Sequence, residues 1–504
     1  MTNARDLRTQ FPPLELPAQL VRDLLRFNPW WQGKPGAALP STRRTLVSMI
    51  KRRLDQRLAP IVVVRGPRQI GKTTAQLQLI KQMLAEGVRP DRIFRIQFDE
   101  LSSLRGIDEP ILQIVEWYEE TMLKRTLNEA ARAGEAAILF FDEIQNLSDW
   151  APQLKSLVDN ATVQAVVTGS SALRIELGRD SLAGRITTIE AGTLSLTEIG
   201  QFRGLDMPAA FLPDNGLEPL TRQGFWQELR EHGARHAAMR DATFQAFSER
   251  GSFPLAHSAA NIPWPQVADQ LNETVIRRVI QHDLRLGERG RRRDAALLEE
   301  LFRLSCRYIG QAPDNGLFAR EAQRALQANV GVVRVQQYMK FLSNSLLLRL
   351  IEPLEIRLKK KHGATKLCLV DHGLRASWLQ EVIPLAPDQL AAAPELYDLA
   401  GRIAESVVGA TLLTINGLDV AHFPARPMEP EVDYVLTIGT LRIPMEVKYR
   451  RRINGWAETE GLRAFLEKTV YHAPFGILVT QSDEATVTDP RIVCVPLSSL
   501  MMLR

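Results

Sequence analysis

The chain has 504 residues, too many for a single hydrophobic core, and at about 100 to 200 residues per domain this length predicts roughly three or four domains. Hydrophobic residues make up 45% and charged residues 24%, which is typical of a soluble globular protein. No run of about 18 apolar residues could span a membrane, and the first residues lack the continuous apolar stretch of a signal peptide.

Cysteine usage and charge add two expectations. The three cysteines, Cys306, Cys368 and Cys494, are too few and too scattered for a disulfide framework or a zinc site, so we expect a protein of the reducing cytoplasm. The formal net charge is +5, and the C-terminal half contains three basic clusters, which indicate either solvated faces or an anionic partner such as nucleic acid. These clusters are residues 285–294, 357–362 and 448–452.

Residues 1–45 are expected to form an N-terminal arm. It contains the sequence "LLRFNPWWQGK" (24–34), with paired tryptophans at Trp30 and Trp31. Such a pair either packs into a core or stacks on a flat ring such as the adenine of a nucleotide.

The sequence "IVVVRGPRQIGKTT" (61–74) has the pattern G-x-x-x-x-G-K-T between a buried strand and an amphipathic helix. The two glycines allow backbone N–H groups to wrap phosphates, Lys72 supplies a positive charge, and the Thr73 hydroxyl can bind Mg²⁺ at the positive end of the helix. The pattern therefore predicts a phosphate loop that binds ATP and Mg²⁺. Its expected cofactor-binding residues are Gly66, Pro67, Arg68, Gln69, Ile70, Gly71, Lys72, Thr73 and Thr74.

Two further strands are expected to complete this site. "EAAILFFDEIQNLSDW" (135–150) is a buried strand that ends in paired acids, of which Asp142 would hold Mg²⁺ and Glu143 would polarise the attacking water. "VQAVVTGSSAL" (163–173) ends in small polar residues, and Ser170 is the candidate for a side chain between this strand and the γ-phosphate, with Thr168 and Ser171 beside it.

These motifs, followed by "LAGR" (182–185) and "LSLTE" (194–198), resemble the AAA-type (AAA+) P-loop ATPases of a bacterial and archaeal group, in which a domain of uncharacterised function follows the ATPase domain. The family usually has a proline before the second motif, which this chain lacks. The resemblance implies an α/β parallel-sheet ATPase core over residues 46–204 and a homo-oligomer that can be a ring. It also implies that Arg185 is the arginine finger, acting in its own subunit or, as in ring-forming relatives, in a neighbour's site.

Residues 205–290 have a mostly helical pattern, which in such ATPases forms a helical lid and connector. Residues 291–385 then have the spacing of a winged helix-turn-helix, with residues 298–344 as helices and the following apolar segments as the wing. The exposed side of its recognition helix would carry Arg334, Gln336, Gln337 and Lys340. Because winged helices bind DNA in some proteins and other proteins elsewhere, both partners stay open.

The C-terminal residues 396–504 begin with a helix that contains Glu405 and continue into "EVDYVLTIGTLRIPMEVKYR" (431–450). A two-residue turn at Gly439 and Thr440 would place Asp433 directly opposite Glu446, although like charges in that position normally cost stability. Glu405, Asp433, Glu446 and Lys448 match the spacing of a restriction-endonuclease-like α/β core. In such a core Asp433 and Glu446 would bind Mg²⁺ and Lys448 would act on the attacking water, unless the scaffold serves only DNA binding or assembly.

The sequence thus predicts an ATP-hydrolysing AAA+ protein that acts on DNA, without membrane association. Two alternatives stay open. One is a nucleotide-dependent switch that signals to a protein partner, and the other is a metal-dependent DNA nuclease, regulated by ATP, in defence against foreign DNA.

Overall fold

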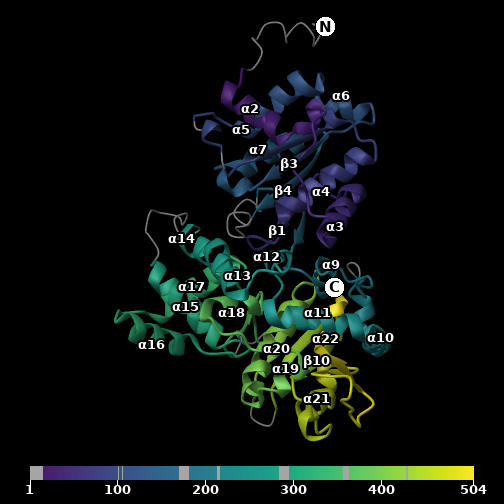
Figure 1. The fold of residues 1–504 in the computed structure, drawn as a ribbon, viewed down its shortest axis with the longest axis vertical. Helices are drawn as coiled ribbons and strands as arrows, with labels where there is room; N and C mark the ends of the chain where they lie inside the picture. Colours follow the sequence, from purple (N-terminus) through teal and green to yellow (C-terminus); the bar gives the residue numbers. More distant parts are fainter. Residues whose placement is uncertain are drawn as a thin grey trace. The chain divides into compact units, whose positions relative to one another are not determined.

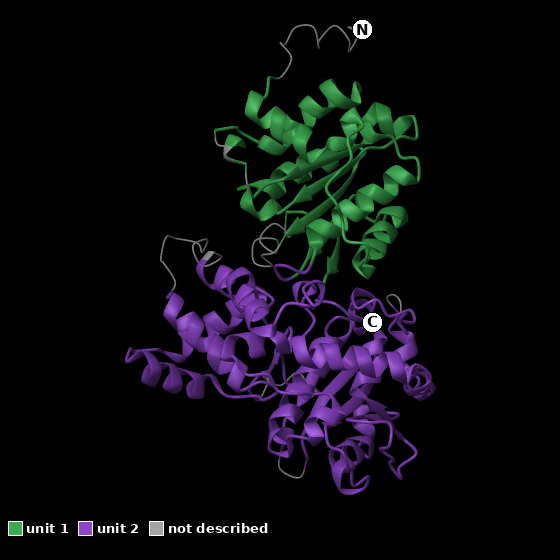
Figure 2. Cartoon of the chain, viewed as in Figure 1, with its two compact units in different colours: residues 1–66, 71–191 green, residues 67–70, 192–504 purple. Residues whose placement is uncertain are grey.

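The computed structural model describes residues 15–99, 101–104, 106–169, 181–212, 216–282, 294–355, 363–426 and 429–504. The chain divides into two compact units, of which unit 1 contains residues 1–66 and 71–191 and unit 2 contains residues 67–70 and 192–504 (Figure 2). Among the described residues, no helix combines the length and the apolar character needed to cross a membrane. The three cysteines are buried and free.

The sheet of unit 1 is entirely parallel, with the strand order β2-β3-β4-β1-β5 (Figure 1). This arrangement confirms the α/β parallel-sheet fold predicted for the N-terminal half. The strands are β1 (Ile61–Arg65), β2 (Ile93–Gln97), β3 (Ile138–Asp142), β4 (Gln164–Gly169) and β5 (Ile186–Glu190).

Helices cover both faces of this sheet. Ile61 and Val63 of β1 belong to the core that also contains side chains of α2, α5 and α7, whereas Val62 and Val64 are buried on the other face. On that other side α3 and α4 contact each other and β1 or β4. Burial on both faces explains the continuous apolar runs of the strands. The helices of unit 1 are α2 (Ala18–Phe27), α3 (Thr45–Gln56), α4 (Lys72–Ala85), α5 (Pro110–Tyr118), α6 (Leu127–Arg132) and α7 (Trp150–Asn160).

The N-terminal arm packs into the core of unit 1. The indole N–H groups of Trp30 and Trp31 both donate to the carbonyl of Ile93, at 3.1 and 3.0 Å, and the Trp31 ring stacks on Tyr118. Ile93 is the first residue of β2, so these rings lie at the amino end of the parallel sheet, whereas the phosphate loop follows the carboxyl end of β1. Core packing is therefore the correct alternative, and stacking on adenine is not.

The sheet of unit 2 is mixed, with the order β12-β11-β10-β9-β8. β8, β9 and β10 are antiparallel neighbours, while β10, β11 and β12 run parallel. Helix α21 (Glu460–Leu466) contacts β9, β10 and β11, and α20 (Tyr397–Leu412) contacts β10. The strands are β8 (Asp419–Phe423), β9 (Val432–Ile438), β10 (Leu441–Lys448), β11 (Gly476–Thr480) and β12 (Ile492–Pro496).

The β9–β10 hairpin has the predicted register. Its pairs run from Ile438 with Leu441 to Tyr434 with Met445, and Gly439 in the turn has a φ of 59°, which glycine adopts without steric cost. Continuing this register by one residue places Asp433 opposite Glu446. Two carboxyl groups therefore do meet at the end of this hairpin.

Three helices and a two-stranded antiparallel sheet precede α20. They are α15 (Ala295–Arg307), α16 (Asn315–Leu326), α17 (Val332–Asn344), β6 (Leu348–Ile351) and β7 (Lys366–Leu369). This is the element order expected of a winged helix, and the assignment stays a prediction. The segment after β6 joins the larger sheet, because Leu354 N donates to His422 O at 2.8 Å and His422 N donates to Glu352 O at 3.0 Å.

The helices expected as a lid and connector belong to unit 2 and pack on its mixed sheet. Helix α10 (Gln223–Arg235) contacts β12 and α22 (Leu497–Leu500), and α11 (Ala237–Arg250) contacts α22. Arg240 pairs with Asp483 at 2.8 Å and donates to Ser499 at 2.9 Å, which joins α11 to the C-terminal residues. These contacts show that the segment supports the C-terminal sheet, and a role as a lid over nucleotide stays a prediction. The remaining helices include α12 (Pro254–Ser258), α13 (Trp264–Leu271), α14 (Arg278–His282), α18 (His372–Leu379) and α19 (Pro387–Ala391).

The "LSLTE" motif has a local structural explanation. Ser195 precedes α9 (Leu196–Phe202) and accepts a hydrogen bond from Glu198 N at 3.2 Å, while Glu198 accepts one from Ser195 N at 2.9 Å. This reciprocal pair is a capping box, which satisfies two backbone donors at the start of a helix. The motif therefore forms the N-terminus of α9, the helix that follows β5.

Candidate functional site

The phosphate loop connects β1 to α4. Gly71 has a φ of 88° and α4 begins at the next residue, so the loop ends at a helix N-terminus whose backbone N–H groups are available to an anion. Lys72 is only 5% exposed, and its ammonium donates to the carbonyl of Gly66 at 2.9 Å. The lysine side chain thus folds back over the loop that it is expected to serve.

Asp142 ends β3 and is fully buried. Its Oδ2 accepts from the Arg95 guanidinium at 2.8 Å, and its Oδ1 accepts from the Thr168 hydroxyl. Gln76 of α4 donates to the same hydroxyl at 3.3 Å, so hydrogen bonds link the helix after the phosphate loop to Asp142 through β4. The sequence motifs do not predict Arg95 as a partner of Asp142, and they indicate Thr168 only as a neighbour of Ser170.

Thr73 and Asp142 have the ligand chemistry that Mg²⁺ prefers, because both offer oxygen atoms. Thr73 lies in the first turn of α4, beside Lys72, and Asp142 is linked to the same helix through Thr168 and Gln76. Both oxygens of Asp142 already accept from the protein. The residues fit a bound Mg²⁺, provided that Asp142 exchanges one of these partners or binds the ion through water.

A second group of acidic residues lies in unit 2, around Lys366 of β7. The Lys366 ammonium is 1% exposed and donates to Glu405 Oε1, to Asp433 Oδ1 at 3.0 Å and to the Asp433 carbonyl at 3.3 Å. All three of its N–H groups therefore have acceptors. We call Lys366, Glu405 and Asp433 the Lys366 cluster.

Glu446 and Lys448 form a neighbouring pair on β10. The Lys448 ammonium donates to Glu446 Oε1 at 2.6 Å, and the Asp433 N–H donates to Glu446 Oε2 at 3.4 Å. Asp433 Oδ2 in turn accepts from Val447 N at 2.9 Å. The four predicted nuclease-site residues are thus brought together, but each carboxyl group is bound by a protein donor.

Burial and neighbouring charges shift the pKa values of these groups in opposite directions. Burial, together with the charge of Asp433, raises the pKa of Glu405 well above its ordinary value and raises that of Glu446 to about 8. Burial would also raise the pKa of Asp433, but the Lys366 ammonium and the hydrogen bond with Glu405 lower it. Asp433 therefore holds the negative charge that Lys366 balances, while Glu405 and Glu446 favour their neutral forms.

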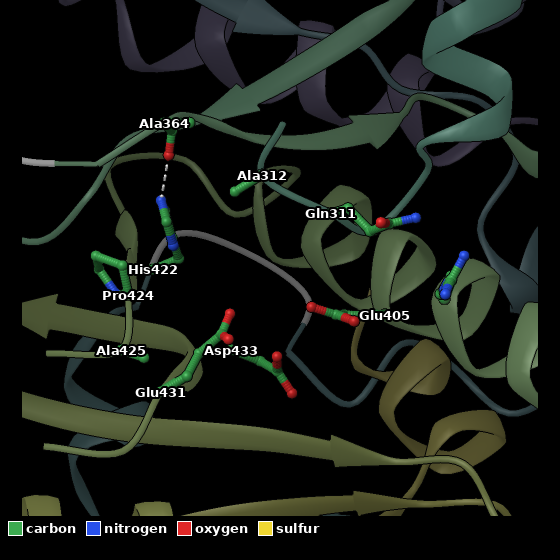
Figure 3. Close-up of a pocket in the computed structure, with 11 residues that line it drawn as sticks. Gln311, Ala312, Ala364, Glu405, His422, Pro424, Ala425, Glu431 and Asp433 are labelled. Carbon is green, nitrogen blue, oxygen red and sulfur yellow. Dashed lines mark hydrogen bonds between the residues drawn. The ribbon is translucent and has the colours of Figure 1, made fainter. Parts of the chain in front are cut away.

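A cavity of about 480 Å³ adjoins the Lys366 cluster (Figure 3). Glu405, Glu431 and Asp433 line it, and His422 lies on its wall with Nε2 bonded to the Ala364 carbonyl at 2.9 Å. That bond makes Nε2 the donor, so the buried Nδ1 of His422, which has no hydrogen-bond partner, is the acceptor. Burial, followed by the charge of Lys366, lowers the pKa of His422 to about 4.

Residues 58–200 match the family of AAA domains, residues 242–382 match a domain of unknown function (DUF8612), and residues 400–500 match another domain of unknown function (DUF4143). The chain carries an AAA-type domain. This match covers the phosphate loop and Asp142.

Two uncharacterized proteins, of Mycobacterium bovis and Mycobacterium tuberculosis, are each 26% identical over 289 residues. The match covers 51% of this chain and 59% of each relative, so it spans little more than half of those proteins. A solved structure of Drosophila ORC bound to DNA aligns with 75% of this chain and 100% of that chain, at 14% identity. Its TM-score of 0.24 is too low to imply a shared fold.

Within the AAA domain, Arg185 lies at the opposite end of the sheet from the phosphate loop. β5 runs parallel to β1 with Ile186 beside Ile61 and Glu190 beside Arg65, so Arg185 precedes the strand while the phosphate loop follows β1. The guanidinium forms two bonds to Asp159 of α7, at 2.5 and 3.0 Å. Arg185 is therefore placed away from the phosphate loop of its own subunit.

Glu143 directly follows Asp142, with a φ of 51°. This left-handed conformation turns the chain at the end of β3, and the Glu143 carboxylate accepts a hydrogen bond from Gln145. Ser170 and Ser171 lie outside the described residues, and β4 is described to Gly169. Thr168 is the described polar residue of this strand that contacts Asp142.

Helix α17 has the predicted polar surface. Arg334, Gln336, Gln337 and Lys340 are exposed, and the intervening Val335 and Tyr338 are buried. Arg334 pairs with Asp294 at 3.3 Å. Of the three basic clusters, residues 357–362 and most of 285–294 lie outside the described residues, whereas Arg450, Arg451 and Arg452 are exposed at the end of β10.

Proposed function

We propose that this chain is an ATP-hydrolysing AAA+ protein that acts on DNA. The observation that supports hydrolysis is the connected set of Lys72, Gln76, Thr168 and Asp142, which joins the phosphate loop to the acidic end of β3. A buried lysine at the start of the helix and a buried aspartate at the carboxyl end of a parallel strand support a site for bound phosphates.

The residues have distinct roles in this proposal. Backbone N–H groups at the start of α4 and the Lys72 ammonium bind the phosphates, and Thr73 and Asp142 hold Mg²⁺, which neutralises charge that develops on the phosphates. Glu143 orients and polarises the attacking water. Arg95 holds the Asp142 side chain in place before the nucleotide binds, through an ion pair of 2.8 Å.

The test of hydrolysis is the substitution Lys72→Ala. We expect ATP turnover to fall at least about 100-fold, because the positive charge on the phosphates is lost. Lys81→Ala is the matched control, since Lys81 is an exposed lysine on the same helix and its removal should leave turnover unchanged. Unchanged turnover in Lys72→Ala would refute the proposal.

Arg185 would act as an arginine finger on the nucleotide of a neighbouring subunit. Its position at the far end of the sheet favours this arrangement over action in its own subunit, and reaching a neighbour requires opening its pair with Asp159. We expect Lys72→Ala and Arg185→Ala to be inactive separately and to regain part of the activity when mixed. A mixture that stays inactive although the subunits exchange would contradict action in a neighbour's site.

DNA binding is proposed for the exposed polar face of α17. Lys340 and Arg334 can bind phosphates, while Gln336 and Gln337 have amide groups suited to base edges. We expect duplex DNA affinity to fall steeply with salt, because phosphate contacts release counterions, and to fall further in Arg334→Ala with Lys340→Ala. Absence of any affinity at low salt would contradict this part of the proposal.

One observation favours the alternative of a nucleotide-dependent switch with a protein partner. Val332 and Val333, at the start of α17, are 43% and 67% exposed, which is unusual for the end of a helix that would face a charged phosphate backbone. If this face binds a protein, Val333→Ser should weaken a protein complex and leave DNA affinity unchanged. If it binds DNA, Lys340→Ala should have the larger effect on DNA.

A further inference from the structure

The spacing of Glu405, Asp433, Glu446 and Lys448 predicted a Mg²⁺ site in the C-terminal domain, and the residues present do not fit one. A divalent ion bound by carboxylates needs several oxygen atoms that face a common point. Among the described residues no group of three or more histidine, cysteine, aspartate or glutamate side chains is arranged to hold a metal ion. The space between Glu405 and Asp433 is instead taken by the Lys366 ammonium.

We infer that Lys366 is the permanent cation of this acidic cluster and takes the place of a divalent metal. Its ammonium contacts Glu405 Oε1, and it lies 3.0 Å from Asp433 Oδ1. The lysine is 1% exposed, so it cannot exchange with a metal ion by swinging into solvent without opening the surrounding structure. The cluster is therefore a metal-free ionic connection and has no nuclease chemistry of its own.

Several hydrogen bonds hold the cluster and the neighbouring pair of Glu446 and Lys448. Lys366 uses three donors, Asp433 Oδ2 accepts from Val447 N, and Glu446 accepts from Lys448 and from the Asp433 N–H. A metal ion would have to displace several of these bonds at once. Because Lys366 balances the charge of Asp433 and Lys448 donates to Glu446, the cluster needs no metal to be stable.

The cluster also joins three segments of unit 2. Lys366 belongs to β7, Glu405 to α20 and Asp433 to β9, and Leu369 N of β7 donates to the Ser406 hydroxyl at 3.0 Å. Gly409 permits this close packing, because a Cβ there would lie 2.6 Å from Cys368 Sγ and 2.8 Å from the Tyr434 hydroxyl. Lys366 is thus positioned by the pairing of β7 with β6 and by the packing of α20 on β7.

The test is a Mn²⁺ titration of the full chain without nucleotide, read by the electron paramagnetic resonance signal of free Mn²⁺. We expect the wild type and Asp433→Asn to bind the same amount of Mn²⁺, because the cluster holds none. Lys366→Met removes the ammonium and keeps the length of the side chain, and we expect it to gain one Mn²⁺ with at least about tenfold tighter binding than the wild type shows. Lys468→Met is the matched control, since it removes a lysine that pairs with Glu429 on the same domain, and it should gain nothing.

Two results of the Mn²⁺ titration would overturn the inference. The first is a Mn²⁺ site in the wild type that Asp433→Asn or Glu405→Gln removes. The second is a folded Lys366→Met that binds no additional Mn²⁺. If Lys366→Met does not fold, the Mn²⁺ binding of the wild type, compared with that of Asp433→Asn and Glu405→Gln, still tests whether the cluster holds a metal.

Incubation of DNA with Mn²⁺ provides an independent readout. The wild type should leave DNA as intact as Asp433→Ala and Lys448→Ala do. Cleavage by the wild type alone would overturn the inference. These outcomes do not depend on ATP hydrolysis by the AAA domain.

Discussion

Asp142 in the AAA domain and Asp433 in the C-terminal domain are both buried aspartates of β-strands, and each is bound by a buried basic side chain. Arg95 lies 2.8 Å from Asp142, and Lys366 lies 3.0 Å from Asp433. The surroundings differ. Asp142 is linked through Thr168 to the helix that follows a phosphate loop, whereas Asp433 shares its lysine with a second acid, Glu405.

Asp142 is proposed to bind Mg²⁺ together with a nucleotide, whereas Asp433 has the Lys366 ammonium as its cation. In the proposed function, a nucleotide with Mg²⁺ would bring new charge to Asp142 and would compensate for the loss of a bond to Arg95. No phosphate loop lies beside Asp433 among the described residues. All three N–H groups of the Lys366 ammonium already donate to protein oxygens, so none is left for a ligand. A buried acid with a nearby base is therefore not by itself evidence of a metal site.

The largest effect is expected from Lys366→Met. Loss of the ammonium leaves Asp433 as an uncompensated buried charge, and we expect the free energy of unfolding of unit 2 to fall by about 3 to 5 kcal/mol. Urea-dependent labelling of Cys306, Cys368 and Cys494 measures this, because all three buried thiols lie in unit 2. Lys468→Met should cost about 1 kcal/mol or less, since Lys468 is 40% exposed.

Equal labelling curves for Lys366→Met and the wild type would show that the lysine does not stabilise the acids. The matched pair of lysines separates this effect from the general loss of a positive charge. A fall in both variants by the same amount would point to net charge rather than to the cluster.

Arg95→Met tests the other member of the comparison. We expect a loss of about 3 kcal/mol in unit 1, because Asp142 keeps only the Thr168 bond, and we expect Mg²⁺ with ATP to restore more stability than it adds to the wild type. Thermal unfolding with and without Mg²⁺ and ATP measures both. Arg89→Met is the control, since Arg89 is 47% exposed. If Mg²⁺ and ATP stabilise Arg95→Met less than the wild type, Arg95 does not compete with the metal.

Much of the fold was predictable from the sequence because its signals are local. The phosphate loop, the acidic end of β3 and the hairpin register follow from glycine spacing, apolar runs and a two-residue turn. The two tryptophans were ambiguous, because packing and stacking require the same side chains. Their position at the amino end of the sheet, known only from the structure, decides between the two.

The basic partners were missed for a physical reason. Lys366 is 39 residues before Glu405 and lies in the segment expected to be a separate winged helix, so the site crosses a predicted domain boundary. Arg95 lies in β2 between the apolar residues Phe94 and Ile96. A usable signal was present in both cases, because a charged residue within a buried strand requires an opposite charge nearby. The sequence could have indicated that a partner exists, but not which acid it is.

A buried base without an opposite charge extends the comparison. His257 Nε2 donates to the Gly251 carbonyl at 2.8 Å, and its Nδ1 accepts from Arg203 at 3.3 Å. Burial, and after it the charges of Arg203, Arg250 and His372, lowers its pKa from 6.5 to about 4, against the opposing effect of the Gly251 bond. Protonation would place two positive groups in contact, so the folded state keeps this histidine neutral.

The sign of the resulting pH dependence follows from proton binding. Between about pH 6.5 and pH 4 the unfolded chain binds a proton that the folded chain does not, so this stability is present above pH 6.5 and is lost as the pH falls toward 4. We expect the stability lost between pH 7 and pH 5 to be smaller by about 2 kcal/mol in His257→Gln than in the wild type. Urea unfolding at both pH values measures the difference, and His472→Gln, at an exposed histidine, should behave as the wild type.

The smallest effect on stability is expected at Thr168, whose uncharged hydroxyl donates to Asp142, in contrast to the charged donors Arg95 and Lys366. Thr168→Val keeps the shape of the side chain and removes the hydroxyl that Asp142 Oδ1 accepts from, so we expect about 1 kcal/mol less stability in unit 1. Thr168→Ser keeps the hydroxyl and should retain the bond. Because Gln76 reaches Asp142 only through this hydroxyl, Thr168→Val should also slow ATP hydrolysis, whereas Thr168→Ser should not. Equal hydrolysis in the two variants would show that Asp142 is held in place by Arg95 alone.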